Sequence, residues 1–279
     1  MSHVPSLPTG TFGKSQVPTI SAIVLNYRTP EDTLRCVAAL ERQTIASDLE
    51  ILIVDNHSGD RSVAAFRKLL GEGKRIQIVE MPRNLGYGRA NNEGVARAKG
   101  EFVLIINPDT TLEPDALEQM VRFLREHPDV GIVGPQLIHP NGKIRDSFRT
   151  FPTPMDVFIK RTLLRLFFRK RMGTYLQWGK DPHAVRDVDW VVGACLCMRR
   201  DFFRELGGFD PRFFLFFEDT DLCRRCHRAG RRVVYFPRAK AHDSAHRLSS
   251  GGLLTVFLKR TVRIHLVSAF KYFWKWKEG

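Results

Sequence analysis

Short apolar runs alternate with amphipathic segments along the first half of the chain. Runs rich in Val, Ile and Leu predict buried strands, and apolar positions repeated every three or four residues predict helices. The predicted strands are residues 19–27, 49–56, 75–81 and 101–107, and the helices between them are 31–43, 62–70 and 88–100. Alternating strands and helices with short connections specify an α/β fold: a mostly parallel sheet with helices on both faces.

The second half of the chain is less regular. A stretch with Pro, Gly and clustered Arg and Lys, residues 140–187, predicts a long mobile excursion, and such loops are usually functional lids or binding loops. The other predicted elements are helices 113–127, 201–208, 217–230 and 253–277, and strands 130–138, 187–200 and 231–236. We therefore expect a flexible leader over 1–18, one α/β domain over 19–245 and a helical C-terminal extension over 246–279.

Polar side chains follow the predicted strands, at the edge where open parallel sheets bind ligands. Asn26, Asp55 and Asp109 stand at strand ends, and Glu218, Asp219 and Asp221 open a late helix. Carboxylates in a basic protein suit a divalent cation or the abstraction of a proton. Each one alone also suits a turn or a helix N-terminus. Their shared edge favours a functional site.

A glycine-containing turn opens the predicted helix at 88–100. Its sequence is Asn84-Leu85-Gly86-x-Gly88, followed by Arg89, Asn91 and Asn92. Backbone N–H groups at such a helix start can hold an anion. The motif is neither a Walker loop nor a dinucleotide fingerprint, so taken alone it favours a tight turn with a capped helix.

Charge adds a second expectation. The 279 residues carry 44 Lys+Arg against 30 Asp+Glu, a formal net charge of +14. This indicates a polyanionic partner, which could be nucleic acid, anionic lipid or a phosphorylated substrate. No apolar run is long enough to span a membrane, and the first residues have no signal-peptide core.

Two stretches interleave basic and apolar residues: 158–172 and the C-terminal tail. On a helical wheel, Leu254, Leu258, Val262, Leu266 and Phe270 drift along one side of the tail. This pattern is typical of a helix lying in an anionic membrane interface. The alternative is a terminal helix that packs its apolar side on the domain. Nucleic-acid binding is disfavoured, because no nucleic-acid motif accompanies the stretches.

The five cysteines are an odd number in a chain without an export signal, which favours reduced thiols in the cytosol. Cys195 and Cys197 together with Cys223 and Cys226 could suggest zinc. Both Cys195 and Cys197 lie in an apolar run, however, where buried thiols fill a core well. We expect core residues.

Four motifs in order resemble the family 2 glycosyltransferases of GT-A fold. They are IVLNYRTP, IVDNHSGD, NLGYGRANNEGVARAKGEFVLIINPDT and GGFDPRFFLFFEDTDLCRR. The Asn-Pro-Asp in place of the usual Asp-x-Asp, with the GGFD and EDxDL segments, is most similar to the bacterial rhamnosyltransferase-like subgroup. The resemblance covers residues 19–245.

The resemblance implies a role for each matching residue. It assigns donor binding to Asn26, Tyr27, Arg28, Asp55, Asn84, Gly86, Arg89, Asn92 and Asn107. Asp109 and His242 would hold Mg²⁺ or Mn²⁺ on the donor diphosphate. Asp219 matches the catalytic base, with Glu218 and Asp221 supporting it.

The implied reaction is inverting transfer of a sugar by single displacement. The expected donor is dTDP-rhamnose, with a UDP-hexose as the alternative. The expected acceptor is a cell-surface glycan precursor, in this family often a polyprenyl-diphosphate-linked saccharide, at the inner face of the cell membrane. A non-catalytic module that binds nucleotide-sugars or polyanions is the alternative from another class. The donor sugar, the linkage and the oligomeric state do not follow from the sequence.

Overall fold

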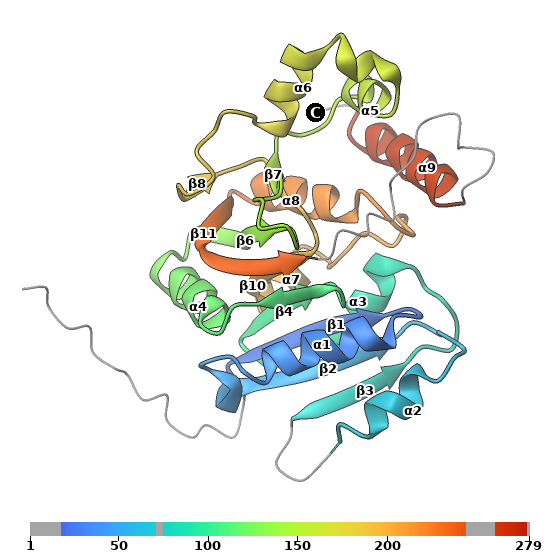
Figure 1. Cartoon of the computed structure of the whole chain (residues 1–279), viewed down its shortest axis with the longest axis vertical. Coiled ribbons are helices and arrows are strands. Elements are labelled where there is room, and N and C mark those ends of the chain that lie inside the picture. Colours follow the sequence, from blue (N-terminus) through green and yellow to red (C-terminus); the bar gives the residue numbers. More distant parts are fainter. Residues whose placement is uncertain (1–17, 71–74, 244–259, 278–279) are drawn as a thin grey trace, which may run out of the picture.

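A computed structural model describes residues 18–70, 75–243 and 260–277 of the chain (Figure 1). The expected leader, apart from its last residue, and the first part of the expected C-terminal helix, 253–259, lie outside these residues. Within the described ranges, no helix combines the length and hydropathy needed to cross a bilayer.

The centre of the fold is a twisted sheet of nine strands within the described residues. Its order is β3 (Ile76–Glu80), β2 (Leu49–Asp55), β1 (Ile20–Asn26), β4 (Phe102–Ile106), β10 (Cys195–Arg199), β6 (Val130–Ile138), β11 (Arg232–Asp243) and β5 (Thr110–Leu112), with β8 (Arg186–Asp187) beside β11. The first four strands are parallel, as are β6 and β11, whereas β10, β5 and β8 run antiparallel to their neighbours. The predicted mostly parallel sheet is confirmed, with antiparallel strands added in its second half.

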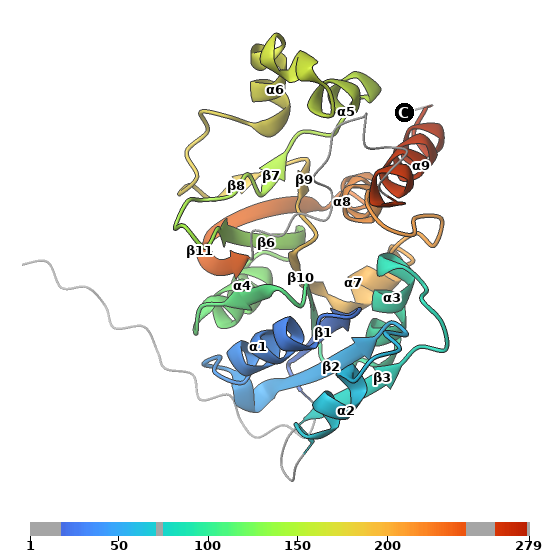
Figure 2. The same ribbon diagram turned by 45° about the vertical axis from the view of Figure 1, so that its right-hand side comes forward.

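Helices cover both faces of this sheet (Figures 1 and 2). One face carries α1 (Pro30–Leu40), α2 (Ser62–Arg67) and α4 (Ala116–Glu126), and the other carries α3 (Tyr87–Arg97), α7 (Arg200–Glu205) and α8 (Glu218–Arg228). Alternate residues of β1 explain this division: Ala22 and Val24 belong to one core cluster, Ile23 and Leu25 to the other.

All five cysteines are buried and unpaired with one another. Cys195 and Cys197 lie in the core cluster on one face of the sheet, and Cys223 and Cys226 lie in the cluster on the opposite face. The two pairs therefore cannot share one tetrahedral ion. The prediction that they are core residues is confirmed.

The excursion at 140–187 differs from the irregular segment that composition suggests. It contains β7 (Phe148–Arg149) and α5 (Pro154–Lys160), then a short 3₁₀ turn, η2 (Leu163–Leu166), and α6 (Arg169–Leu176). Thr153 and Asp156 form a reciprocal capping box at the start of α5, with Pro154 in its first turn. These are ordinary helix-start signals, which the basic composition obscured.

The prediction of a single strand over 187–200 is wrong as well. This segment forms two strands, β9 (Trp190–Val191) and β10, which are separated by Gly193. Strand β9 pairs with β7. The N–H of Gly193 donates to the Asp219 carboxylate and not to a neighbouring strand, so the ladder is interrupted here. In addition, β11 continues well beyond the predicted residue 236, and β5 was not predicted.

The C-terminal helix α9 (Arg260–Lys275) packs on the domain beside α8 and α5 (Figure 2). Ala269, Tyr272 and Trp276 are buried against Phe213 and Phe217 of the loop before α8. The packing alternative is therefore correct for this face. The apolar side that the wheel groups is divided between two environments, because Val262 is buried whereas Phe270 is 68% exposed.

Candidate active site

A network of polar side chains fills the carboxyl ends of β1 and β2. The Asn26 amide nitrogen donates to Asp55 Oδ1 (2.7 Å) and to Ser58 Oγ (2.9 Å), and its oxygen accepts from Thr33 Oγ1 (3.0 Å). Asp55 also accepts from the backbone N–H and hydroxyl of Ser58. Asn26 and Asp55 are buried, so this network fixes the shape of the strand ends before any ligand binds.

Tyr27 and Arg28 stand on the exposed side of this network. The guanidinium of Arg28 lies 5.3 Å from the Tyr27 ring centre, and its Nε donates to the Ser58 carbonyl. Arg28 adopts a left-handed backbone conformation, with φ 61°. A flat aromatic ring and a cation at the rim of parallel strands suit a nucleobase and a phosphate.

The glycine turn before α3 is held by Asn56 and Asn84. The Asn56 side chain donates to Asn84 Oδ1 (3.1 Å) and accepts from the N–H of Leu85 (2.8 Å). Gly86 has φ +81°, and a Cβ on it would lie 2.3 Å from the carbonyl oxygen of Phe214. This position therefore requires glycine, both for its backbone angle and for the close approach of the 209–217 loop.

Arg89 and Asn92 bind that same loop. Arg89 Nε donates to the carbonyl of Pro211 (2.9 Å), and the Asn92 amide exchanges two 2.8 Å hydrogen bonds with the backbone of Phe209. In the structure these side chains join α3 to the loop that leads into α8. Their assignment to donor binding stays a prediction.

Asp219 lies at the start of α8, half-buried beside the broken strand. Its Oδ2 accepts from the N–H of Gly193 (2.9 Å), and its Oδ1 accepts from the N–H of Thr220 (2.7 Å). Burial raises the pKa of this carboxyl, while the two N–H groups and the charge of Arg149 oppose the rise. The result is a carboxylate held in one orientation and with increased basicity.

Three carboxylates act on the pKa of Tyr87. Burial, followed by the charges of Glu218, Asp219 and Asp109, raises the pKa of the Tyr87 phenol well above its usual value. The Tyr87 hydroxyl donates to the carbonyl of Gly193 (2.8 Å). Asp109 and the α8 acids therefore all lie within electrostatic reach of Tyr87, although Asp109 follows β4 and the acids lie more than one hundred residues away in the sequence.

Glu218 is buried, and its Oε2 has no hydrogen-bond partner among the described residues. Burial and the neighbouring Asp219 raise the pKa of Glu218 well above its usual value. A buried carboxyl with an unpartnered oxygen at a strand edge is a group available to a ligand.

The loop before these acids has an unfavourable backbone. Phe216 and Phe217 are both left-handed, with φ 71° and 69°, which bulky residues rarely adopt. The loop is held by α9: Ser268 Oγ donates to the carbonyl of Leu215 (2.8 Å), and Tyr272 packs on Phe217. Such conformations persist where the surroundings impose them, often at functional sites.

Asp221 faces α9 and not the strand edge. It is fully buried, and its oxygens bind Arg225 Nε (2.8 Å), Lys275 Nζ (2.7 Å) and Trp276 Nε1 (2.9 Å). The structure thus joins Asp221 to the C-terminal helix, and its predicted support of catalysis would act through the position of α8.

The predicted metal ligands are only partly brought together. Asp109 is half-buried at the end of β4, next to Asn107, whose N–H donates to the carbonyl of Ala194 (2.8 Å). His242 of β11 lies opposite Thr111 of β5, but its Nε2 is 3.2 Å from Glu113 Oε1. The described residues include no group of three His, Cys, Asp or Glu side chains able to hold a metal. This donor set suits a cation that arrives on a diphosphate better than a resident ion.

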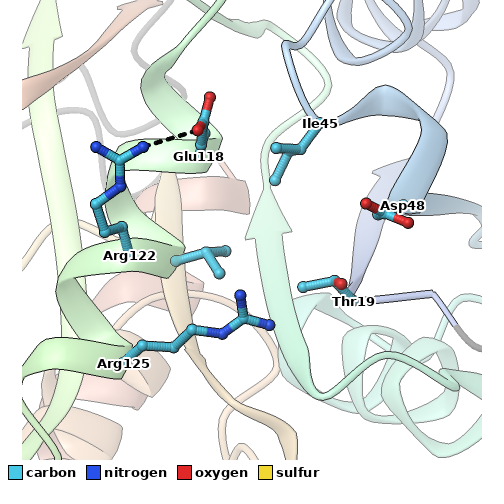
Figure 3. A pocket seen from close by; sticks show the side chains of 7 residues that line it. Thr19, Ile45, Asp48, Glu118, Arg122 and Arg125 are labelled. Carbon is cyan, nitrogen blue, oxygen red and sulfur yellow. Dashed lines mark hydrogen bonds and ion pairs between the residues drawn. The ribbon is translucent and has the colours of Figure 1, made fainter. Parts of the chain in front are cut away.

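A small cavity of about 60 Å³ lies at the opposite edge of the sheet (Figure 3). Its lining includes Thr19, just before β1, and the ion pair between Glu118 and Arg122 of α4. Pockets for nucleotide-sized ligands hold several hundred Å³. This cavity is therefore too small for a nucleotide, and its lining lies where β1 and β2 begin and not where they end.

Sequence reasoning missed four residues of the site. Ser58, Tyr87 and Gly193 fix the strand-end network and the orientation of Asp219, and Arg149 of β7 acts on the pKa of Asp219. A lone glycine in a strand pattern signals a break, so Gly193 was detectable. Nothing local in the sequence marks Arg149, because only tertiary folding brings β7 to α8.

The fold and the strand-edge carboxylates define the class: this is a glycosyltransferase of GT-A fold. Residues 21–207 match the family model described as "Glycosyl transferase family 2". The chain therefore belongs to this family. The predicted family and fold are confirmed.

Two curated relatives are similar over most of the chain. The N-acetylglucosaminyl-diphospho-decaprenol L-rhamnosyltransferase of Mycobacterium tuberculosis is 28% identical over 81% of this chain and 76% of its own length. The rhamnosyltransferase WbbL of Escherichia coli K12 is 29% identical over 67% of this chain and 69% of its own.

A solved structure shares the fold. The crystal structure of GalNAc-T7 with UDP, GalNAc and Mn²⁺ matches with a TM-score of 0.63 at 15% identity, over 89% of this chain. The chain spans only 48% of that protein, and at this identity the likeness supports the fold alone.

Proposed function

We propose that the protein transfers a sugar from a nucleotide-sugar to an acceptor hydroxyl by inverting single displacement, with Asp219 as the base. The observation that carries this is the Asp219 carboxylate itself, half-buried at the carboxyl edge of the sheet and oriented by the N–H of Gly193. Its raised pKa makes it a better proton acceptor than an exposed aspartate, yet the two N–H bonds favour its charged form.

In this reaction the acceptor oxygen forms a bond to the anomeric carbon as the bond from that carbon to the diphosphate breaks. The acceptor proton passes to Asp219, and the electron pair of the broken bond stays on the diphosphate. Glu218 would bind the acceptor through its unpartnered Oε2. Tyr87 would keep the Gly193 turn, and hence Asp219, in place through its 2.8 Å hydrogen bond.

A divalent cation, Mg²⁺ or Mn²⁺, would arrive with the donor and be held by Asp109. One carboxylate and the phosphate oxygens suffice for such a site. When bound, the cation would stabilise negative charge on the leaving diphosphate. Asn107 would bind donor beside it, and His242 would join only after leaving Glu113. Mn²⁺ is present with UDP in the GalNAc-T7 structure, which supports this proposal.

The donor we favour is dTDP-rhamnose, and the acceptor a polyprenyl-diphosphate-linked saccharide of a cell-surface glycan, at the cytoplasmic face of the membrane. The names of the two curated relatives support rhamnose, and that of the mycobacterial one supports a lipid diphosphate. A UDP-hexose is the alternative donor. Binding of dTDP- and UDP-sugars, with and without Mn²⁺ or Mg²⁺, measured as thermal shifts, separates the two.

Replacing the base tests the mechanism. Asp219→Asn should reduce transfer by about 10²-fold or more while leaving the donor-induced thermal shift intact, because only the proton acceptor is lost. The matched control is Asp201→Asn, which changes a carboxylate that is 87% exposed on α7. Undiminished turnover in Asp219→Asn would exclude Asp219 as the base. A lost thermal shift would place Asp219 in donor binding instead.

A further inference from the structure

Helix α9 has apolar residues on two opposite faces. Its inner face, with Ala269, Tyr272 and Trp276, is buried on the domain. Phe270 and Trp274 point the other way and are 68% and 63% exposed, with their ring centres 6.0 Å apart. A terminal helix that only packed on its domain would present polar residues to water.

Basic residues flank the outward face of α9. Arg263, Lys271 and Lys277 are exposed, and the Lys277 ammonium lies 4.3 Å from the Trp274 ring centre. No Asp or Glu occurs between 260 and 277. This side of the helix is therefore aromatic and cationic, a combination typical of surfaces at the level of lipid headgroups.

A second segment, distant in the sequence, repeats this chemistry. Leu163, Leu166 and Phe167 are 75%, 60% and 81% exposed, and no residue of η2 is buried. Arg165, Arg169 and Lys170 are interspersed among them and are also exposed. With Phe168, which is 47% exposed, four large apolar side chains are exposed over 163–168. Isolated exposed apolar residues are ordinary, but four within six positions are not.

The two segments lie at the same end of the molecule (Figures 1 and 2). Helix α5 contacts both η2 and α9. The charges of Lys160 and Arg161, just before η2, contribute to the lowered pKa of His265 on α9, which places them close to that helix. Exposed aromatic and basic residues therefore gather at this end from two parts of the chain.

We propose that residues 163–170 and the outward face of α9 together form a docking surface for an anionic lipid bilayer. The charge selects this occupant: exposed cations among exposed aromatic rings complement acidic headgroups above an apolar layer. Binding is interfacial, with the rings at headgroup depth. The proposal goes beyond the transfer reaction, because it depends on neither the donor nor Asp219.

Sedimentation of the full chain with vesicles tests the surface. The vesicles are phosphatidylcholine alone, or phosphatidylcholine with phosphatidylglycerol. Wild type should bind the anionic vesicles at least about tenfold more strongly than the neutral ones. Phe270→Ser/Trp274→Ser and Leu163→Ser/Phe167→Ser should each reduce that binding by about tenfold or more. Because these side chains are exposed, the variants should keep the wild-type melting temperature.

Two controls match the size of these changes elsewhere. Leu70→Ser/Val185→Ser removes two side chains that are 48% and 40% exposed, and should leave binding unchanged. The charge of the surface is tested by Arg165→Glu/Lys170→Glu, which should weaken binding to anionic vesicles by about tenfold. Its control is Arg67→Glu/Arg97→Glu on α2 and α3, which should have a much smaller effect.

Three results would overturn the proposal. They are equal binding to neutral and anionic vesicles, unchanged binding of both aromatic variants, and a wild-type dimer that the Phe270→Ser/Trp274→Ser variant converts to a monomer. The last would mean that a second copy of the chain covers this face. None of these results bears on the transfer reaction, so failure here is distinguishable from failure of the proposed function.

Discussion

Lowering the pH should destabilise the protein through one histidine on α9. The imidazole of His265 is packed against the rings of Phe216 and Phe217, with ring centres 5.1 and 5.2 Å away. Its Nδ1 has no hydrogen-bond partner among the described residues. Burial, and then the charges of Arg161 and Lys160, lower the pKa of His265 to about 3. In the folded protein this side chain therefore stays neutral at pH 5.

The sign follows from the unfolded chain, in which histidine titrates near its ordinary value of about 6.5. Below that pH, His265 takes up a proton in the unfolded state but not in the folded state, so the free energy of unfolding falls. The contribution of neutral His265 to the free energy of unfolding is intact above pH 6.5 and decreases steadily as the pH drops toward 3. Between pH 7 and pH 5 the loss from this one group is about 2 kcal/mol.

Urea unfolding at pH 7 and pH 5, followed by tryptophan fluorescence, measures this loss. His265→Phe keeps a ring in the cluster and removes both the titration and the orphaned nitrogen. Other groups titrate in both proteins, so the difference between them isolates His265. Wild type should lose about 2 kcal/mol more than His265→Phe over this interval. Equal losses in the two proteins would refute the reasoning.

Three further perturbations test the site and its support. Arg149→Ala should move the acid limb of the pH–rate profile upward by about half a unit to one unit, because the charge of Arg149 lowers the pKa of Asp219; Arg149→Lys should restore the limb. Gly193→Ala should lower kcat more than it changes donor KM, because its Cβ would lie 2.9 Å from Asp219 Cβ; an unchanged kcat would show that the orientation of Asp219 is not critical. Lys275→Met should lower the free energy of unfolding by about 3 kcal/mol in denaturant titrations, because it removes the ion pairs of Lys275 with Asp210 and with the fully buried Asp221. Among the described residues, Asp221 then keeps Arg225 and Trp276 as side-chain partners, and a loss below about 0.5 kcal/mol would contradict this account.

The strands and helices in the first half of the chain could be predicted because the sequence patterns that mark them are local. Strands such as β1 and β2 are continuous β-branched and apolar runs, and their ends carry Asn26 and Asp55 directly in the sequence. The elements in the second half of the chain could be predicted less well. The strand predicted over 187–200 breaks at Gly193, because a backbone N–H there is bound by Asp219, far along the chain. No local pattern encodes such a partner.

The site shows the same division. Sequence motifs singled out Asp109, Glu218 and Asp219, but the spacing of these residues along the chain says nothing about their distances. Their joint effect on the pKa of Tyr87 depends on β10, which runs antiparallel beside β4 and follows the Gly193 turn that contacts both Tyr87 and Asp219. A long-range strand pairing therefore sets the electrostatics of the site.

The sequence by itself determined the order of strands and helices in the first half of the chain, the polar edge where those strands end, and the family. Each depends on residue type and periodicity within short windows. Only the tertiary structure decided what the C-terminal helix does. Its wheel grouped Val262 and Phe270 on one apolar side, whereas the folded chain buries Val262, Tyr272 and Trp276 and leaves Phe270 and Trp274 exposed. Both sides of α9 are rich in aromatic residues, so periodicity could not choose between them. The choice came from the loop at 209–217, whose Phe213 and Phe217 supply the surface on which the inner face packs.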